Sequence, residues 1–438
     1  MTKQFKGRLF SKKSTQIKTT TLCGKCGLHL KCNSPKIQVR GTGKVPLMFV
    51  IGHPDKNDDV AGYLMCGKEY NELQKFLNLH NINLDDCTIV SATACHIDYN
   101  IPDNKKLAKS ARKYCLPHVT KAIKEYKPNV VIPLGYEAVD SLIKPKYSRG
   151  INDIEVIRGF NIPDQDWKVW LLPMYHPKEL TRLLKKTVNE NGEYEEPSKK
   201  QMNQYTTISN VVKRDLSLAV SLLDTPVPVF PDLKSVNHVL TEQQALIWLD
   251  NAKKEFEDII NRNEIIYLSW DIETTGLRCH NKGHKTYSIS FCYKENESVA
   301  FRWTDKIKEA CKPILEDEKI KKIGANIRYE TVWFKDLEQI YIKGWIFDIC
   351  IGAHILDSRS GIISLKFNTY VMMGIGDYEE NIKKYLKAEN NNAINKIFEC
   401  PEHDMLFYNA IDSYVTRYVA MNMMKRMGIL KDNLKYIG

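Results

Sequence analysis

The chain has 438 residues, more than one ordinary domain core holds, so we expect two or three domains. Its formal net charge of +11 suits a polyanionic partner, and a hydrophobic content of 43% suffices to bury the cores. The sequence has no run of about 18 apolar residues and no charged-then-apolar leader, which argues against a membrane partner and predicts a cytoplasmic protein.

The N-terminal region combines a basic arm with a pair of cysteines. Residues 1–20 carry six lysines or arginines and no acid, as expected for a phosphate-contacting or disordered arm. Cys23 and Cys26 then form a C-x2-C pair, a spacing that lets one loop offer two thiolates to zinc or iron. The chain has 12 cysteines, which in a reducing compartment are metal ligands or buried small residues more often than disulfides.

Strands and helices alternate through the first half of the sequence. Apolar runs predict strands over 45–52, 88–95, 129–135 and 168–174, and helical spacing predicts helices over 70–80 and 105–126. Such an alternation predicts a parallel sheet covered by helices on both faces. Ligands then bind beyond the carboxyl ends of the strands.

This order resembles the iron–sulfur uracil-DNA glycosylases, family 4 of that superfamily, over residues 20–223. The resemblance rests on the C-x2-C pair, a Gly-containing loop after the first strand, the VVIPLG strand and the late His176-Pro177 pair. It implies a three-layer α/β/α fold. It also implies a [4Fe–4S] cluster on four matching cysteines, which are Cys23, Cys26, Cys95 and Cys115.

Two other readings of these cysteines stay open. Cys32 and Cys66 are rival cluster ligands, because the offset from Cys95 to Cys115 is slightly longer than the family usually shows. The plainer alternative is a set of unrelated buried thiols.

The same resemblance implies a pocket for an extruded uracil, but several of its positions have changed. His176 matches the histidine that serves the leaving base, whereas His53 and Asp55 lie in a loop that has lost the usual glutamate unless Asp55 replaces it. Met65 stands where a stacking phenylalanine is expected, and Ser91 where an asparagine reads uracil. We therefore expect this domain to bind DNA without excising uracil.

The two halves are joined by polar and proline-rich sequence. Residues 185–201 are rich in charges of both signs and have no period, which predicts a mobile insertion. A helix is expected over about 208–223. Three prolines between residues 224 and 231 then favour an extended connector, so we place the domain linker at 224–235.

The second half centres on two acids that follow a buried strand. The apolar run 265–270 predicts that strand, and Asp271 and Glu273 lie at its end, one residue apart and therefore on the same face. The alternative is an exposed strand with solvated acids, but the preceding run is too apolar for it. Further elements are expected as a helix over 243–256, a hairpin of 286–293 and 298–303, a strand over 321–326, and helices over 348–356, 364–373 and 405–428.

The last helix supplies two more functional groups. Tyr408 and Asp412 are four residues apart and share a helix face, although a buried tyrosine beside a surface acid is the simpler interpretation. With the Asp-x-Glu strand and the segment from Asn326 to Glu330, this pattern resembles the 3′–5′ exonucleases with four acids and a tyrosine. Such domains proofread in family A DNA polymerases. The resemblance covers residues 236–438 and implies a ribonuclease-H-like fold with a mixed sheet.

What the resemblance implies agrees with the chemistry of the residues. Asp271, Glu273 and Asp412 are expected to hold two divalent ions, Mg²⁺ or Mn²⁺, and Tyr408 to orient the attacking water. Glu330 occupies a position where bacterial enzymes usually have Asp, so it is an expected catalytic residue with a changed reach. Asp348 is expected to be a structural acid, or a spare ligand if Glu330 points away.

The expected substrate is the single-stranded 3′ end of a primer–template DNA. By resemblance, Thr274, Gly276 and Leu277 touch the terminal nucleotide, and Asn326 faces a neighbouring phosphate. Members of the family carry a polymerase domain after the exonuclease, whereas this chain ends at Gly438. The expected partner is therefore a DNA polymerase domain or subunit, either in a longer phage-type polymerase or in a split enzyme.

The sequence thus supports one main hypothesis and two alternatives. The main hypothesis is a proofreading 3′–5′ exonuclease with a non-catalytic, glycosylase-like DNA-binding module. One alternative is a bifunctional repair enzyme that excises uracil and trims ends. The other is an inert scaffold that tethers a polymerase to DNA.

Overall fold

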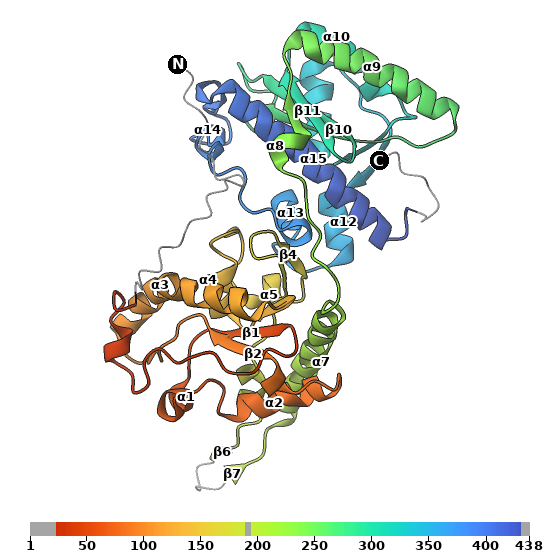
Figure 1. Ribbon diagram of the computed structural model, residues 1–438. Coiled ribbons are helices and arrows are strands. Elements are labelled where there is room, and N and C mark those ends of the chain that lie inside the picture. Colours follow the sequence, from red (N-terminus) through yellow and green to blue (C-terminus); the bar gives the residue numbers. More distant parts are fainter. Residues whose placement is uncertain (1–22, 189–193, 431–438) are drawn as a thin grey trace. The chain divides into compact units, whose positions relative to one another are not determined.

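The computed structural model describes residues 23–188 and 194–430, which form two compact units (Figure 1). Of the described residues, one unit comprises those from 23 to 229 together with Tyr370–Ile375, and the other comprises Phe230–Thr369 and residues 376–430. The predicted basic arm, residues 1–20, lies outside the described residues. Within the described part of the chain, no helix is long and apolar enough to cross a membrane.

The first unit is built on a five-stranded sheet in the order β2-β1-β3-β5-β4. All its neighbouring strands run parallel except β4, which is antiparallel to β5. Its elements are η1 (Leu28–Leu30), β1 (Leu47–Ile51), α1 (Lys56–Ala61), α2 (Lys68–Asn78), η2 (Leu84–Asp86), β2 (Thr88–Ser91), α3 (Pro102–Tyr126), β3 (Val130–Pro133), α4 (Tyr136–Leu142), α5 (Ile154–Ile157), β4 (Ile162–Asp164), β5 (Val169–Leu171), α6 (Lys178–Leu183), β6 (Thr187–Val188), β7 (Tyr194–Glu195) and α7 (Lys199–Ser221).

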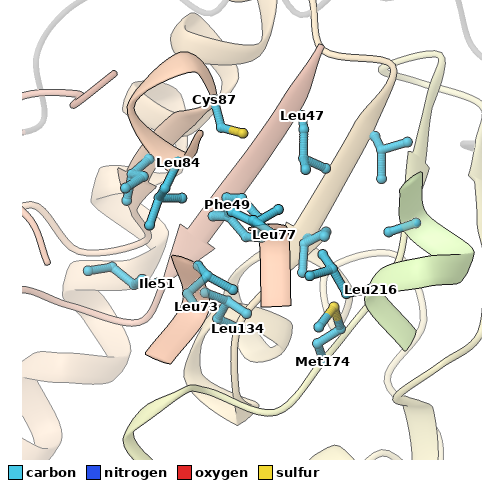
Figure 2. Close-up of a cluster of buried hydrophobic side chains, with 14 of the residues drawn as sticks. Leu47, Phe49, Ile51, Leu73, Leu77, Leu84, Cys87, Leu134, Met174 and Leu216 are labelled. Atoms are coloured by element: carbon cyan, nitrogen blue, oxygen red, sulfur yellow. The ribbon is translucent and has the colours of Figure 1, made fainter. Parts of the chain in front are cut away.

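The core of this unit surrounds β1. All five of its residues are buried, as a central parallel strand covered on both faces requires. Figure 2 shows Leu47, Phe49 and Ile51 of β1 packed beside Leu73 of α2, and Leu216 of α7 belongs to the same cluster. The predicted α/β fold with a parallel sheet is confirmed. The prediction was possible because the central strands have continuous apolar runs.

Three details of this unit differ from the prediction. Strand β4 has only three residues and contains Pro163, so its sequence carries no strand signal. The helix predicted from about residue 208 begins at Lys199, because Ser198 and Gln201 form a capping box there. The predicted insertion also contains the paired strands β6 and β7, while residues 189–193 lie outside the described residues.

The second unit is built on a six-stranded mixed sheet in the order β13-β12-β9-β10-β11-β8. Strand β9 runs antiparallel to β10 and parallel to β12. The elements are α8 (Leu233–Val236), β8 (Asn237–Val239), α9 (Glu242–Asn261), β9 (Tyr267–Thr274), β10 (Thr286–Lys294), β11 (Glu297–Arg302), α10 (Asp305–Glu316), β12 (Lys321–Gly324), α11 (Arg328–Trp333), η3 (Phe334–Glu338), β13 (Trp345–Asp348), α12 (Ile349–Leu356), α13 (Leu365–Met373), α14 (Lys383–Leu386), η4 (Ile397–Glu399) and α15 (Glu402–Arg426).

Strand β9 extends further than its apolar run suggested. It continues through both acids to Thr274, because Asp271 and Glu273 pair in register with Ser290 and Ser288 of β10. Period-2 alternation sends Leu268, Trp270 and Ile272 into the apolar core with α9 and α10, while the acids face the opposite side.

That opposite side is covered by α15, the long helix drawn in blue across the sheet in Figure 1. The helix is buried around most of its circumference, as expected for a helix inside a domain rather than on its surface. Small serines on the strands let it approach closely. The Ser269 hydroxyl donates to the Ser413 carbonyl over 2.7 Å, and the Ser298 hydroxyl donates to the Ala410 carbonyl over 2.8 Å.

Candidate functional site

Helix α15 and strand β9 bring three carboxylates together. Asp271 and Glu273 project from β9 and Asp412 projects from α15, and each offers an oxygen within 4.8 Å of the other two. Glu273 and Asp412 are only 9% and 5% exposed. Three converging oxygen ligands of this kind suit a hard divalent cation such as Mg²⁺ or Mn²⁺.

The charges in this cluster are costly without a cation. Burial raises the pKa of the Asp271 carboxyl, and the nearby Asp412 raises it further. Burial likewise raises the pKa of Glu273, and Asp271 and Asp412 add to the shift. Because burial and like charges both disfavour the ionised forms, the carboxylates are arranged as in a site that gains from bound positive charge.

Glu330, on the first turn of α11, lies near Asp271 and Glu273. It is 4% exposed, and its Oε2 has no hydrogen-bond partner among the described residues. Burial raises the pKa of its carboxyl most, and the negative charges of Asp271 and Asp348 raise that pKa further. An orphaned, buried acceptor beside three acids is the observation that best fits a metal ligand or a metal-bound water partner.

Asp348 has a different role. Its carboxylate accepts backbone N–H bonds from Asn326, Ile327 and Cys350 at 3.1, 2.9 and 2.7 Å. It thereby holds Asn326 in the left-handed conformation, with φ of 66°. These contacts make Asp348 a structural acid that fixes the turn before α11.

Three residues of the site were not found from the sequence. The Lys366 ammonium forms an ion pair with Asp412 and donates to the Tyr378 hydroxyl over 2.7 Å. Tyr378 in turn donates to Asp412. On β9, the carboxylate of Asp271 accepts a 2.8 Å bond from the side-chain amide of Asn409.

Tyr408 lies beside Asp412, as their four-residue spacing requires. Its ring is 6% exposed, lies 5.9 Å from the ring of Tyr378 and has the Lys366 ammonium 4.6 Å from its centroid. Burial raises the pKa of the Tyr408 hydroxyl, and Asp412 raises it further, so the phenol keeps its proton at neutral pH.

The residues expected to touch DNA follow directly after these acids. The Thr274 hydroxyl donates to the Gly276 carbonyl over 2.8 Å, and that carbonyl also accepts from Tyr329 at 2.9 Å. A Cβ on Gly276 would lie 2.2 Å from the His284 ring, so only glycine fits there. Leu277 is 61% exposed and offers an apolar side chain to solvent next to the acid cluster.

The predicted cluster cysteines gather at one end of the first unit. Cys26 and Cys95 are 8% and 4% exposed and pack together, and the backbone N–H of Lys36 donates to Cys95 Sγ over 3.4 Å. Burial raises the pKa of Cys115 to about 11, with smaller contributions from Cys26, Cys95 and Cys23.

Four thiols gathered in this way are a donor set that can hold either an iron–sulfur cluster or zinc. The rival Cys32 is hydrogen-bonded to Cys95, whereas Cys66 interacts with Asp58 instead.

A cavity of about 710 Å³ opens at the carboxyl ends of the strands in the first unit. Four of the five predicted pocket residues line it, namely His53, Asp55, Met65 and His176. Ser91 does not, because it is fully buried at the end of β2, and its hydroxyl has no hydrogen-bond partner among the described residues. The role of Ser91 in reading a base therefore stays a prediction.

The cavity also contains a carboxylate that the sequence did not reveal. Glu137, on the first turn of α4, lies 3.4 Å from His53 Nε2 and accepts a hydrogen bond from the Tyr99 hydroxyl. A Cβ on Gly52 would lie 2.4 Å from Glu137 Oε2, so glycine in that loop makes room for the acid.

His176 is held as a neutral donor. Its Nδ1 accepts the backbone N–H of Lys178 over 3.0 Å, which leaves the proton on Nε2. Burial lowers the pKa of His176 to about 4, so the ring is uncharged at neutral pH.

Comparison with known proteins identifies two regions. Residues 247–428 match the 3′–5′ exonuclease family model, and residues 40–200 match the uracil DNA glycosylase superfamily model. A type-4 uracil-DNA glycosylase from Saccharolobus solfataricus is 26% identical over 160 residues, which cover 35% of this chain and 70% of the relative. Both resemblances predicted from the sequence are confirmed.

Solved structures with similarity include RNase D from Escherichia coli, at 13% identity, with a TM-score of 0.33 and coverage of 44% of this chain and 45% of that one. NrnC from Brucella melitensis with bound Mg²⁺ matches at 15% identity, with a TM-score of 0.27 and coverage of 37% of this chain and 76% of that one.

Proposed function

We propose that this protein is a metal-dependent 3′–5′ DNA exonuclease that proofreads for a DNA polymerase of phage type. The first unit serves as a DNA-binding module that carries a [4Fe–4S] cluster and does not excise uracil. The observation that carries the nuclease proposal is the convergence of Asp271, Glu273 and Asp412 oxygens within 4.8 Å, inside the region that matches the exonuclease family.

The three acids and Glu330 would hold two divalent ions, Mg²⁺ or Mn²⁺, which activate water and neutralise charge on the phosphodiester. Asn409 keeps Asp271 in position through its 2.8 Å bond. The Tyr408 hydroxyl stays protonated and is the group that would orient the attacking water.

Features next to the acids suit a terminal nucleotide. Exposed Leu277 offers an apolar surface against which a base can pack, and Gly276 lets the backbone come close. Asn326 presents its side chain from a turn that Asp348 holds rigid. Contacts of this type position a DNA end without reading its sequence.

The first unit supports DNA binding rather than uracil excision. Met65 lines the cavity in place of an aromatic stacking partner, and Ser91 is buried and is not among the lining residues. The four cysteines would hold the cluster, with the backbone N–H of Lys36 directed at one sulfur. The partner that receives the proofread end is a polymerase domain or subunit.

The test of the main proposal is metal-dependent shortening of a primer that is labelled at its 5′ end and annealed to a template. The Asp271→Ala, Glu273→Ala double variant should lose shortening with Mg²⁺ or Mn²⁺ and still bind the primer. Continued digestion by that variant would exclude the assignment, and no digestion by the unaltered protein would favour the inert scaffold.

One observation favours a second candidate function, a bifunctional uracil-DNA glycosylase and exonuclease. Glu137 supplies the cavity with a carboxylate, and neutral His176 presents an Nε2–H donor on the same cavity. A carboxylate near the sugar and a donor near the leaving base oxygen are what N-glycosidic cleavage needs. Free uracil released from uracil-containing single-stranded DNA would establish this function.

A further inference from the structure

The loop after β9 carries a cysteine and a histidine next to each other, shortly after Leu277 in the sequence. Cys279 is 5% exposed, whereas the side chain of His280 is 68% exposed. The loop is compact rather than extended: its ends pair through the Thr275 and Lys285 backbones over 3.0 Å, and the His284 N–H donates to the Asn281 carbonyl.

A carboxylate reaches this pair from a separate element. Helix α11 continues into the π-helical turn η3, and Asp336 on that turn lies 3.5 Å from His280 Nε2. One atom from each of Cys279, His280 and Asp336 lies within 4.8 Å of the others. π-Helical turns within α-helices are rare and occur often at functional sites.

We propose that Cys279, His280 and Asp336 form a Zn²⁺ site that ties the loop after β9 to the turn after α11. Thiolate, imidazole and carboxylate are the three ligand types that zinc prefers, and water completes the tetrahedron. The backbone amides of Cys279 and His280 interact with the thiol, as amides commonly do around zinc-bound thiolates.

The position of this site gives it a structural purpose. Cys279 follows Leu277 by two residues, and η3 follows directly on the helix that carries Glu330. A zinc ion there would cross-link the segment that borders the acid cluster to the segment that carries one of its acids. The site shares no ligand with Asp271, Glu273 and Asp412, so it is independent of the proposed nuclease activity.

The experiment measures zinc in the purified full-length protein after dialysis against a weak chelator. Single variants Cys279→Ala, His280→Ala and Asp336→Asn should each hold one zinc per chain fewer than the unaltered protein. His280 and Asp336 lie at the surface, with side chains 68% and 35% exposed, so these two variants should fold normally. Cys311→Ala is the matched control, because Cys311 is a buried thiol of the same core.

Two further measurements make the result specific. Cobalt added in place of zinc should give a sulfur-to-cobalt charge-transfer band that is present in the Cys311→Ala control and absent in Cys279→Ala. Added zinc should raise the melting temperature of the unaltered protein but not of the three ligand variants. Any metal that the cysteines of the first unit bind is the same in every sample, so it cancels when the variants are compared.

Equal zinc content in the unaltered protein and in either His280→Ala or Asp336→Asn would overturn the proposal. The Asp271→Ala, Glu273→Ala variant should keep this zinc while losing Mg²⁺-dependent digestion. A failure of the nuclease proposal and a failure of the zinc proposal are therefore separate outcomes.

Discussion

Lys366 forms an ion pair with Asp412 at the edge of the acid cluster. The lysine comes from α13 and the aspartate from α15, and both side chains are largely buried, at 16% and 7% exposure. The positive charge of Lys366 also lowers the pKa values of Asp271 and Glu273, against the effect of burial. Lys366 thus supplies part of the positive charge that a metal ion would otherwise provide.

Replacing Lys366 with Met should therefore have opposite effects on stability and on metal binding. Without metal, the substitution removes the positive charge that lowers the pKa values of Asp271 and Glu273, so unfolding in urea with EDTA should become easier by on the order of 2 kcal/mol. With metal, Mn²⁺ should bind more tightly, as measured by calorimetry, because no ammonium competes for Asp412.

The matched control is Lys294→Met, which removes a surface ion pair with Glu255 at 3.0 Å. Lys294→Met should change neither the unfolding free energy without metal nor the binding free energy of Mn²⁺ by more than about 0.5 kcal/mol. Weaker Mn²⁺ binding by Lys366→Met would contradict the competition and indicate that Lys366 orients Asp412 for the ion instead.

Replacing Glu330 with Gln should make the metal-free protein more stable and the enzyme less active. Its buried carboxyl has a raised pKa, so its ionised form destabilises the folded protein as the pH rises through that pKa. Glu330→Gln should raise the metal-free unfolding free energy by about 1 kcal/mol at pH 8 and lower exonuclease kcat at least about 100-fold. Glu330→Asp should lose less activity because it keeps the charge. An active Glu330→Gln enzyme would remove Glu330 from the catalytic group.

The sequence was sufficient to predict the site residues that lie two to four positions apart on one strand or one helix. Asp271 and Glu273 follow a period of two, and Tyr408 and Asp412 follow a helical spacing of four, so their shared faces could be derived before any fold was known. The central strands were predictable for the same reason, because their apolar runs are continuous.

Residues that meet only through tertiary packing were not predictable. Lys366 reaches Asp412 across 46 positions, and Glu137 reaches His53 across 84, so no spacing rule connects either pair. The Asn409 amide lies next to Tyr408 in the sequence, yet its role depends on the register of α15 over β9 and β10, where it also contacts Ser288. The short strand β4 lacked a periodic signal altogether.

The cysteine assignment predicts which substitutions remove the iron. Cys95→Ser and Cys115→Ser should each abolish the broad visible absorption of an iron–sulfur cluster and reduce bound iron to background. Cys66→Ser should keep both, since that thiol interacts with Asp58. Tightly bound zinc in place of iron, or loss of iron in Cys66→Ser, would refute the assignment.

A buried lysine should make stability depend on pH in the alkaline range. Lys322 on β12 is fully buried, and burial lowers its pKa to about 7 from the ordinary 10.5. Between those values the unfolded chain binds a proton that the folded protein lacks, so the Lys322 contribution to stability improves as the pH rises.

Lys322→Met should accordingly raise the melting temperature by about 2–4 °C at pH 6.5. The gain should shrink toward pH 10, as thermal unfolding across that range would show. Lys321→Met is the control, because Lys321 is only partly buried and bonds the Glu318 carbonyl over 3.0 Å. A gain that is constant with pH would mean that packing, and not the buried charge, sets the effect.

The cavity of the first unit should bind DNA without releasing uracil. The neutral His176 donor and the Glu137 carboxylate are present, but Met65 gives no aromatic stack and buried Ser91 gives no amide to read the base. Each missing contact costs about 10- to 1,000-fold in such chemistry, so release from uracil-containing single-stranded DNA should stay at background. A type-4 uracil-DNA glycosylase assayed in parallel is the positive control. Release of uracil that disappears in both Glu137→Gln and His176→Asn would instead assign glycosylase activity to this cavity. The first substitution removes the carboxylate charge and the second changes the donor, while both leave the surrounding strands intact.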